Sequence, residues 1–181
     1  MKKWLTLETK NILKAHVFRY VKVKRQSPET LDVGEFDIVQ CSNWVNIVAI
    51  TPEKKIVIIK QYRHGIDSFT TEIPGGAINY LEESLVAAKR ELVEETGFTS
   101  DKWYHLGKVD VNPAFMTNFC EINLALDAIK TQVQNLDPFE EITVSLEDLT
   151  VVEEMIKNEE ITHSLVILAI HYYFRFLMQQ P

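Results

Sequence analysis

The segment that most constrains this chain is 72–98, EIPGGAINYLEESLVAAKRELVEETGF, in which a Pro-Gly-Gly turn leads into an acidic stretch. From Leu81 to Thr96 the apolar residues recur at helical spacing, and Gly97 follows as a C-cap. A helix is therefore predicted over Leu81–Thr96. Five glutamates lie between residues 82 and 98, so much of the like charge falls on this single helix.

These glutamates repel one another unless their charge is compensated. Glu91 and Glu95 are four residues apart, a spacing at which like charges destabilise a helix by roughly 0.2–0.5 kcal/mol. Arg90 offsets part of this cost through Glu94. A divalent cation would offset far more, because Mg²⁺ prefers oxygen ligands and takes one or two carboxylates together with substrate phosphates. For the helix alone, a solvated acidic face is the simpler alternative.

Composition excludes several classes of function. With a formal net charge of −7 over 181 residues and no basic block, the chain is not expected to bind nucleic acid or an anionic membrane. Cys41 and Cys120 lack the spacing of a zinc site or a disulfide framework, which fits a reducing, cytoplasmic setting. No segment reads as a signal peptide, and charges interrupt each apolar run before it could span a bilayer.

Outside the acidic helix, the pattern predicts strands first and helices last. Strands are expected at 16–25, 34–41, 44–51, 55–63, near 102–111 and at 120–128, with a tight turn at 52–54. Helices are expected at 146–158 and 161–178. The last helix carries an apolar stripe, facing the core or a subunit, made of Leu165, Leu168, Ala169, Tyr172 and Phe176. The expected fold class is an α+β or α/β sandwich.

The acidic segment also matches a known motif at nine positions, which are Gly76, Glu82, Arg90, Glu91, Leu92, Glu94, Glu95, Gly97 and Phe98. This is the pattern of the Nudix box, and the chain resembles a Nudix hydrolase. That family hydrolyses nucleoside diphosphates linked to another moiety, using Mg²⁺ or Mn²⁺. The flanks NWVNIVAIT, KQYRHG, TEIPGG, NPAFMTN and FEEITV look like the nucleoside-diphosphate-sugar pyrophosphatases, the branch that includes ADP-ribose pyrophosphatases.

The resemblance implies a metal site and a Nudix fold with a mixed sheet between helices. The carbonyl of Gly75 and the carboxylates of Glu91 and Glu95 would surround the cation, with Glu94 close enough to ligate or orient. A residue without Cβ suits such a close backbone approach, although a plain turn is the alternative for the glycine pair. Arg90 would hold a glutamate in place. The implied cofactor is Mg²⁺, with Mn²⁺ as the alternative.

Hydrolysis of a pyrophosphate also requires an activated water. In many ADP-ribose pyrophosphatases the base is a glutamate five residues after the proline that matches Pro113, but this chain has Asn118 there. Because an amide cannot act as a base at neutral pH, the task falls to the loop DPFEEI, with Glu140 ahead of Glu141, or to a box glutamate. An exposed acidic loop is the alternative for Glu140 and Glu141.

The same likeness assigns residues to the substrate. Arg63 is expected to clamp a phosphate, and Glu72 to accept hydrogen bonds from a base or ribose. Trp44 is expected to stack on the nucleobase, although a tryptophan leading into a strand is more often part of the core. Pro113 and Asn118 complete the expected substrate-binding set.

The favoured function is therefore a Mg²⁺-dependent pyrophosphatase that splits a nucleoside diphosphate sugar, such as ADP-ribose or GDP-mannose, into a nucleoside monophosphate and a sugar phosphate. Two alternatives are a nucleoside triphosphate sanitiser of the same superfamily and a non-catalytic Nudix-fold ligand sensor. Residues 1–43 are expected to form a β-rich extension and residues 44–181 the Nudix domain. In the matched family such an extension pairs with that of a second subunit, so a homodimer is expected.

Overall fold

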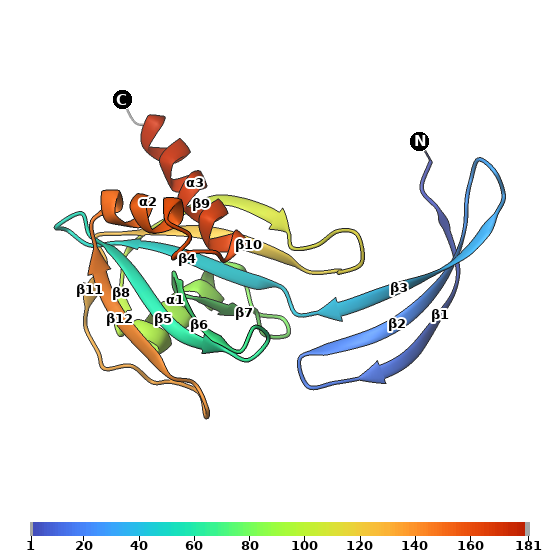
Figure 1. Ribbon diagram of the computed structural model, residues 1–181, viewed down its shortest axis with the longest axis horizontal. Coiled ribbons are helices and arrows are strands. Elements are labelled where there is room, and N and C mark those ends of the chain that lie inside the picture. The colour runs from blue at the N-terminus through green and yellow to red at the C-terminus, as the bar shows by residue number, and fades with distance from the viewer. Residues whose placement is uncertain (1, 180–181) are drawn as a thin grey trace. The chain divides into compact units, whose positions relative to one another are not determined.

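The computed structural model describes residues 2–179, so the outermost residues of the expected extension and domain, 1 and 180–181, lie outside it. The chain divides into two compact units (Figure 1). One comprises Met1–Asn43 and Asp110–Phe119, and the other comprises Trp44–Val109 and Cys120–Pro181. Within residues 2–179, no helix is both long and apolar enough to cross a membrane.

The smaller unit is a three-stranded antiparallel sheet in the order β1 (Leu5–Lys14), β2 (Phe18–Gln26) and β3 (Val33–Cys41). The sequence analysis did not predict β1. Two register shifts interrupt its pairing with β2, and every one of its residues is exposed, so it lacks the alternation that marks a half-buried strand. The segment Asp110–Phe119 joins β3 through hydrogen bonds at Val39.

The larger unit contains a seven-stranded mixed sheet. Its strands are β4 (Trp44–Ile50), β5 (Ile56–Arg63), β6 (Ser68–Glu72), β7 (Gly75–Ala77), β9 (Lys102–Asp110), β10 (Phe119–Leu126) and β12 (Ile142–Glu147). The sheet is mixed because β4 runs parallel to β10 and antiparallel to β5. The predicted turn between β4 and β5 is confirmed, and a small second sheet pairs β8 (Phe98–Thr99) with β11 (Ile129–Lys130).

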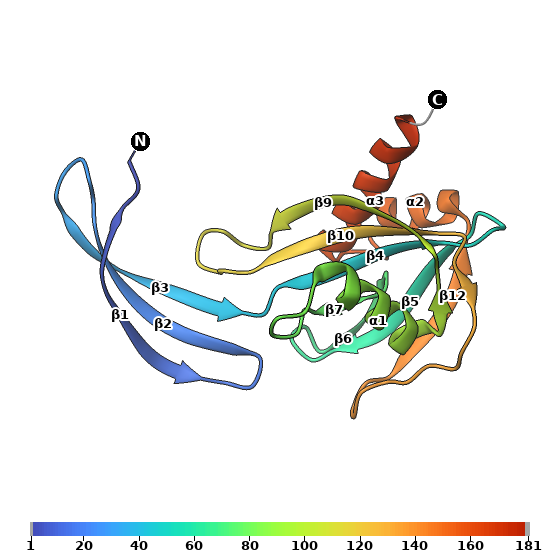
Figure 2. The same ribbon diagram turned by 180° about the vertical axis from the view of Figure 1, so that it is seen from behind.

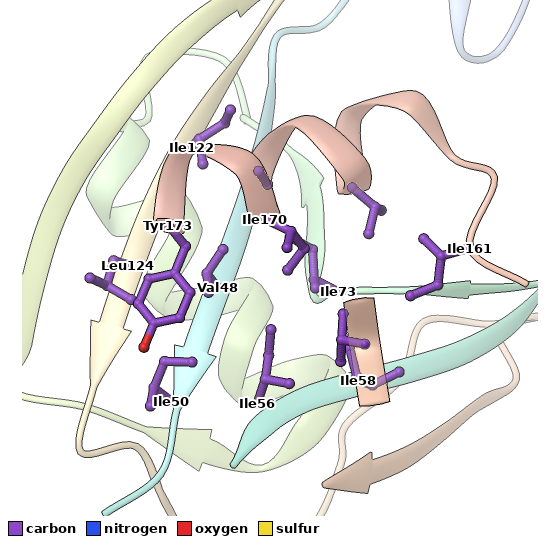
Figure 3. Close-up of a cluster of buried hydrophobic side chains, with 13 residues drawn as sticks. Val48, Ile50, Ile56, Ile58, Ile73, Ile122, Leu124, Ile161, Ile170 and Tyr173 are labelled. Atoms are coloured by element: carbon purple, nitrogen blue, oxygen red, sulfur yellow. The ribbon is translucent and has the colours of Figure 1, made fainter. Parts of the chain in front are cut away.

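Helices cover both faces of this sheet (Figures 1 and 2). The helix α1 (Ser84–Thr96) packs on one face, and α2 (Leu149–Lys157) and α3 (Ser164–Met178) pack on the other. Successive residues of β4 alternate between the two cores: Val45 and Ile47 lie in the core under α1, whereas Val48 and Ile50 lie in the core under α2 and α3 (Figure 3). The predicted α+β sandwich is confirmed.

All three predicted helices begin three residues later than expected, α1 at Ser84, α2 at Leu149 and α3 at Ser164. The acidic helix begins at Ser84 rather than Leu81, because Leu81 has a left-handed backbone with φ of 63° and cannot belong to a right-handed helix. The buried residues of α3 are Leu165, Val166, Ala169, Ile170 and Tyr173. The predicted stripe is therefore confirmed at Leu165 and Ala169, whereas its members Leu168, Tyr172 and Phe176 are only partly buried.

A fork in the sheet determines where a site can form. Strands β4 and β5 pair at Ile50 and Ile56 and then separate, with β7 beside β4 and β6 beside β5 (Figure 1). The link between β6 and β7 is buried, and the Pro74 carbonyl accepts a hydrogen bond from the Ile47 N–H at 2.8 Å. The open end of the fork brings β5 and β7 toward the C-terminal half of α1.

Candidate functional site

A pocket with a volume of about 390 Å³ lies in the larger unit, and its walls come from β5, β7, α1 and the segment before β12. Five carboxylates line it: Glu91, Glu94, Glu95, Asp137 and Glu140. Two guanidinium groups, those of Arg63 and Arg90, lie among them, and Gly75 and Gly76 form part of the wall. The pocket is therefore anionic, with two fixed cations.

Arg90 is saturated by protein acceptors. Its Nε and Nη2 groups donate to the two carboxylate oxygens of Glu82, both at 2.9 Å, and Nη2 also donates to the Ala77 carbonyl at 3.0 Å. Nη1 donates to Glu91 at 2.8 Å and to Glu94 at 2.9 Å. A guanidinium has five N–H groups, so Arg90 has none left for a ligand. These bonds lower the pKa of Glu82 to about 2 and raise that of Arg90.

Glu91 and Glu95 are held by the glycine pair. The Glu91 carboxylate lies where a side chain on Gly76 would be, and Glu95, only 2% exposed, accepts the Gly75 N–H at 2.8 Å. Burial raises the pKa of Glu95 well above its ordinary value, and the charges of Glu91 and Glu140 raise it further. Burial also raises the pKa of Glu91, against the opposing effect of Arg90. Such crowding of acids favours a bound cation.

The oxygen atoms that the pocket offers as metal ligands fit a hard divalent cation. Carboxylate oxygens from Glu91, Glu94 and Glu95, with the Gly75 carbonyl, are the ligands that Mg²⁺ prefers. Across residues 2–179, no three acidic, histidine or cysteine side chains are grouped as a complete metal cage. Mg²⁺ does not require one, because it usually keeps several waters and takes oxygens from substrate phosphates.

The loop before β12 contributes Glu140 but not Glu141. Glu140 lines the pocket, whereas Glu141 is exposed and lies outside the lining. The loop is closed on itself, because the Glu140 N–H donates to the Asp137 carbonyl at 3.1 Å and the Glu140 carboxylate accepts the Asp137 N–H at 3.2 Å. Sequence reasoning missed Asp137 as a pocket residue, and its only signal was the acidic composition of this loop.

Arg63 reaches the pocket from the end of β5, paired with Glu72. Its Nε and Nη2 groups each donate to one oxygen of Glu72 at 2.7 Å. Glu72 is 3% exposed, and one of its oxygens also accepts the Thr70 hydroxyl at 2.5 Å. The structure thus engages both oxygens of Glu72 within the protein, whereas the sequence analysis expected them to accept from a base or ribose.

The remaining expected substrate residues are not among those that line this pocket. Trp44 starts β4, is half-buried and pairs with Ala77 of β7 without lining the pocket. Pro113 and Asn118 belong to the smaller unit. Pro113 is exposed there, and Asn118 is buried, with neither side-chain nitrogen nor oxygen bonded to a protein group.

A family model described as the NUDIX domain matches residues 42–165, about two thirds of the chain. The chain belongs to the Nudix family. The prediction drawn from the nine box positions is confirmed.

Several relatives show which branch of the Nudix family this chain resembles. It is 31% identical over 172 residues to a methanol dehydrogenase activator of Bacillus methanolicus, a match that covers 91% of this chain and 92% of that protein. It is 27% identical over 172 residues to an ADP-ribose pyrophosphatase of Bacillus subtilis (strain 168), covering 92% and 93%. A 90-residue match at 31% identity to an ADP-ribose pyrophosphatase of Mycobacterium tuberculosis covers 49% and 44%. The predicted Nudix branch, which includes ADP-ribose pyrophosphatases, is supported.

The fold is shared with a solved structure of an ADP compounds hydrolase. The two match with a TM-score of 0.86 over 98% of this chain and 96% of that one, at 19% identity. In this Nudix fold the box serves the core as well as the pocket. Leu92 and Phe98 are buried in the core between α1 and the sheet, and Gly97, with φ of 75°, ends the helix by donating its N–H to the Val93 carbonyl at 2.8 Å.

Proposed function

We propose that this protein hydrolyses the pyrophosphate bond of a nucleoside diphosphate sugar, with ADP-ribose as the first candidate, to give AMP and ribose 5-phosphate. The observation that carries the proposal is the pocket itself, in which three box glutamates on one face of α1 lie with two carboxylates, Asp137 and Glu140, from a different segment. Two of the relatives are ADP-ribose pyrophosphatases, which supports the choice of substrate.

Mg²⁺, or Mn²⁺ in its place, is the proposed cofactor, and the carbonyl of Gly75 with Glu91, Glu94 and Glu95 would hold it. When bound, the cation would neutralise phosphate charge and make a water easier to deprotonate. The role proposed for Arg90 is to orient Glu91 and Glu94, since it has no N–H free for the substrate. Arg63, which has donors left, binds a phosphate oxygen.

Glu140 is the proposed general base. Its carboxylate takes a proton from the attacking water while the water oxygen bonds to phosphorus, and the bond between that phosphorus and the bridging oxygen breaks. The bridging oxygen leaves with the other phosphate. Glu140 lines the pocket beside the box acids, whereas Glu141 is exposed, which favours Glu140 between the two candidates of the loop.

A homodimer formed through the smaller unit is the proposed assembly. Strand β1 exposes Leu5, Leu7, Ile12 and Leu13, a set of apolar side chains unusual for a surface that meets only water. Its position at the edge of a three-stranded sheet leaves backbone groups available for pairing. The cytoplasm is the proposed location, and the two free cysteines are consistent with it.

The likeness to a methanol dehydrogenase activator supports one alternative, a regulatory role, which a non-catalytic ligand sensor would fill. A substrate panel distinguishes the two. The purified protein is incubated with Mg²⁺ and ADP-ribose, GDP-mannose, other sugar nucleotides or nucleoside triphosphates, and products are separated by chromatography. Release of AMP from ADP-ribose, lost in Glu95→Gln, is the expected result. Absence of turnover on the whole panel would contradict the proposal and favour the regulator.

A further inference from the structure

We propose that Thr70 and Glu72 are positioning residues that hold Arg63 in the orientation in which its guanidinium meets a phosphate group of the ligand. The inference rests on the proposed function, since it concerns how the same pocket grips a pyrophosphate. Glu72 then positions Arg63 instead of accepting hydrogen bonds from the substrate. Thr70 joins the residues on which ligand binding depends.

The two pocket arginines differ in how many of their N–H groups are free. All five N–H groups of Arg90 are used by protein acceptors, as described above. Arg63 uses Nε and one N–H of Nη2 on Glu72, and within residues 2–179 its Nη1 group has no protein acceptor. Arg63 therefore carries the free guanidinium donors in a pocket otherwise rich in carboxylates, and 43% of its side chain is exposed.

Two side chains from one face of β6 support Arg63. On β6, Thr70 and Glu72 are two residues apart and so share one face of the strand, next to the Gln61 and Ile59 positions of β5. The paired oxygens of Glu72 meet one edge of the guanidinium in a bidentate arrangement, which fixes its plane and leaves the other edge outward. The Thr70 hydroxyl fixes the carboxylate in turn.

The support of Arg63 is negatively charged. Glu72 is almost fully buried, and a buried carboxylate destabilises a protein unless it is paired and hydrogen-bonded. Burial by itself raises the pKa of Glu72, but the hydrogen bonds from Arg63 and Thr70 outweigh it and lower the pKa below its ordinary value. Glu72 is thus an anion at neutral pH whose oxygens are both engaged, which suits support of Arg63 rather than contact with a ligand.

A pre-oriented guanidinium loses less conformational freedom when it binds a phosphate, so loss of the support should weaken binding. Inorganic pyrophosphate is the probe, because it presents the phosphates without a base or sugar. Its affinity for the full-length protein with MgCl₂ is measured by calorimetry for Arg63→Ala, Glu72→Gln and Thr70→Val. KM and kcat for ADP-ribose are measured alongside.

Arg63→Ala should weaken pyrophosphate binding by roughly tenfold or more, and Thr70→Val and Glu72→Gln by about threefold or more, in line with the loss of hydrogen bonds to charged groups. Thr70→Ser keeps the hydroxyl and should restore affinity. Thr71→Val is the matched control, because Thr71 is the next residue of β6, is half-buried and alternates to the opposite face. It should bind as the wild type does. In an Arg63→Ala background, Thr70→Val should cause no further loss, because its effect passes through Arg63.

Wild-type affinity in both Thr70→Val and Glu72→Gln would overturn the proposal, as would full additivity of Thr70→Val with Arg63→Ala or a wild type that does not bind pyrophosphate. If Glu72→Gln fails to fold, Thr70→Val decides, since valine closely matches the shape of threonine. If the variants lose affinity as expected but the wild type leaves ADP-ribose intact, the positioning role stands and the proposed substrate is wrong.

Discussion

A β-carbon placed on Gly76 would lie 2.3 Å from the carboxyl carbon of Glu91. Non-bonded atoms do not approach so closely, so the carboxylate occupies space that any other residue at position 76 would fill. On its other side, Glu91 accepts a hydrogen bond from Arg90 at 2.8 Å. The position of this acid in the pocket therefore depends on the absence of one side chain and on the contact with another.

Gly76→Ala should displace the Glu91 carboxylate and lower kcat by about tenfold or more, as expected when the support of a metal ligand is disturbed. Gly65→Ala is the matched control, because a β-carbon on Gly65 meets no atom within 4 Å. Steady-state turnover of ADP-ribose with saturating Mg²⁺ measures both variants. Equal activity in Gly76→Ala and Gly65→Ala would show that Glu91 does not need the space that Gly76 leaves.

Glu95→Gln should lower kcat by about two orders of magnitude or more, because it removes a carboxylate that acts mainly in the transition state. Glutamine still offers an oxygen to the Gly75 N–H and removes a buried charge, so metal-free protein should melt no lower than the wild type. Glu83→Gln, next to the same helix and without a capping hydrogen bond, is the control. Near wild-type turnover of Glu95→Gln would rule out its role as a metal ligand.

Glu140→Gln should lower kcat by roughly 10²–10⁴-fold if Glu140 deprotonates the water, with little change in the dependence on Mg²⁺. Glu141→Gln should be nearly silent, since Glu141 is exposed and outside the pocket lining. If Glu141→Gln loses activity and Glu140→Gln does not, the base is Glu141. If neither variant loses activity, a box glutamate is the base.

The ion pair of Glu82 with Arg90 predicts a pH dependence of stability. The pKa of Glu82 in the folded protein is about 2, because Arg90 donates two hydrogen bonds to it. In the unfolded chain a glutamate titrates near about 4.3, so the stabilisation is complete above that pH and is lost as the pH falls toward about 2. The difference in unfolding free energy between wild type and Glu82→Gln should therefore be constant from pH 8 to about 5.5 and shrink below about pH 4.3. Urea unfolding at several pH values measures it, and a difference unchanged down to pH 3 would contradict the assignment.

The proposed dimer predicts a solution mass of twice 20.9 kDa by light scattering at micromolar concentration. Replacing Leu5 and Leu7 by lysine should shift the protein toward the monomer, because charged residues on an edge strand oppose pairing. The Lys2 and Lys3 positions, replaced by alanine, serve as a nearby control. A clean wild-type monomer with full activity would overturn the proposed assembly.

Sequence reasoning succeeded best where the interacting residues are close along the chain. The nine box positions span one turn and one helix, so their spacing alone predicts that Glu91, Glu94 and Glu95 share a face and that Arg90 lies within reach of Glu94. It was less accurate at the start of α1, where Leu81 adopts a left-handed backbone and the helix begins three residues later than predicted. Strand β1 was missed because an exposed, bulged strand has no regular burial pattern to detect.

The sequence by itself determined the family, the sandwich fold class and the acids of the box, because local periodicity and short-range spacing are written directly in the order of residues. Only the tertiary structure decided that Glu140 rather than Glu141 lines the pocket, that Asp137 joins it, and that Glu72 is engaged by Arg63. Those relationships depend on strand pairing between β5 and β6 and on the path of a loop that returns beside α1. The register of strands and the direction of a loop are set by the packing of the whole sheet, which no short stretch of sequence contains.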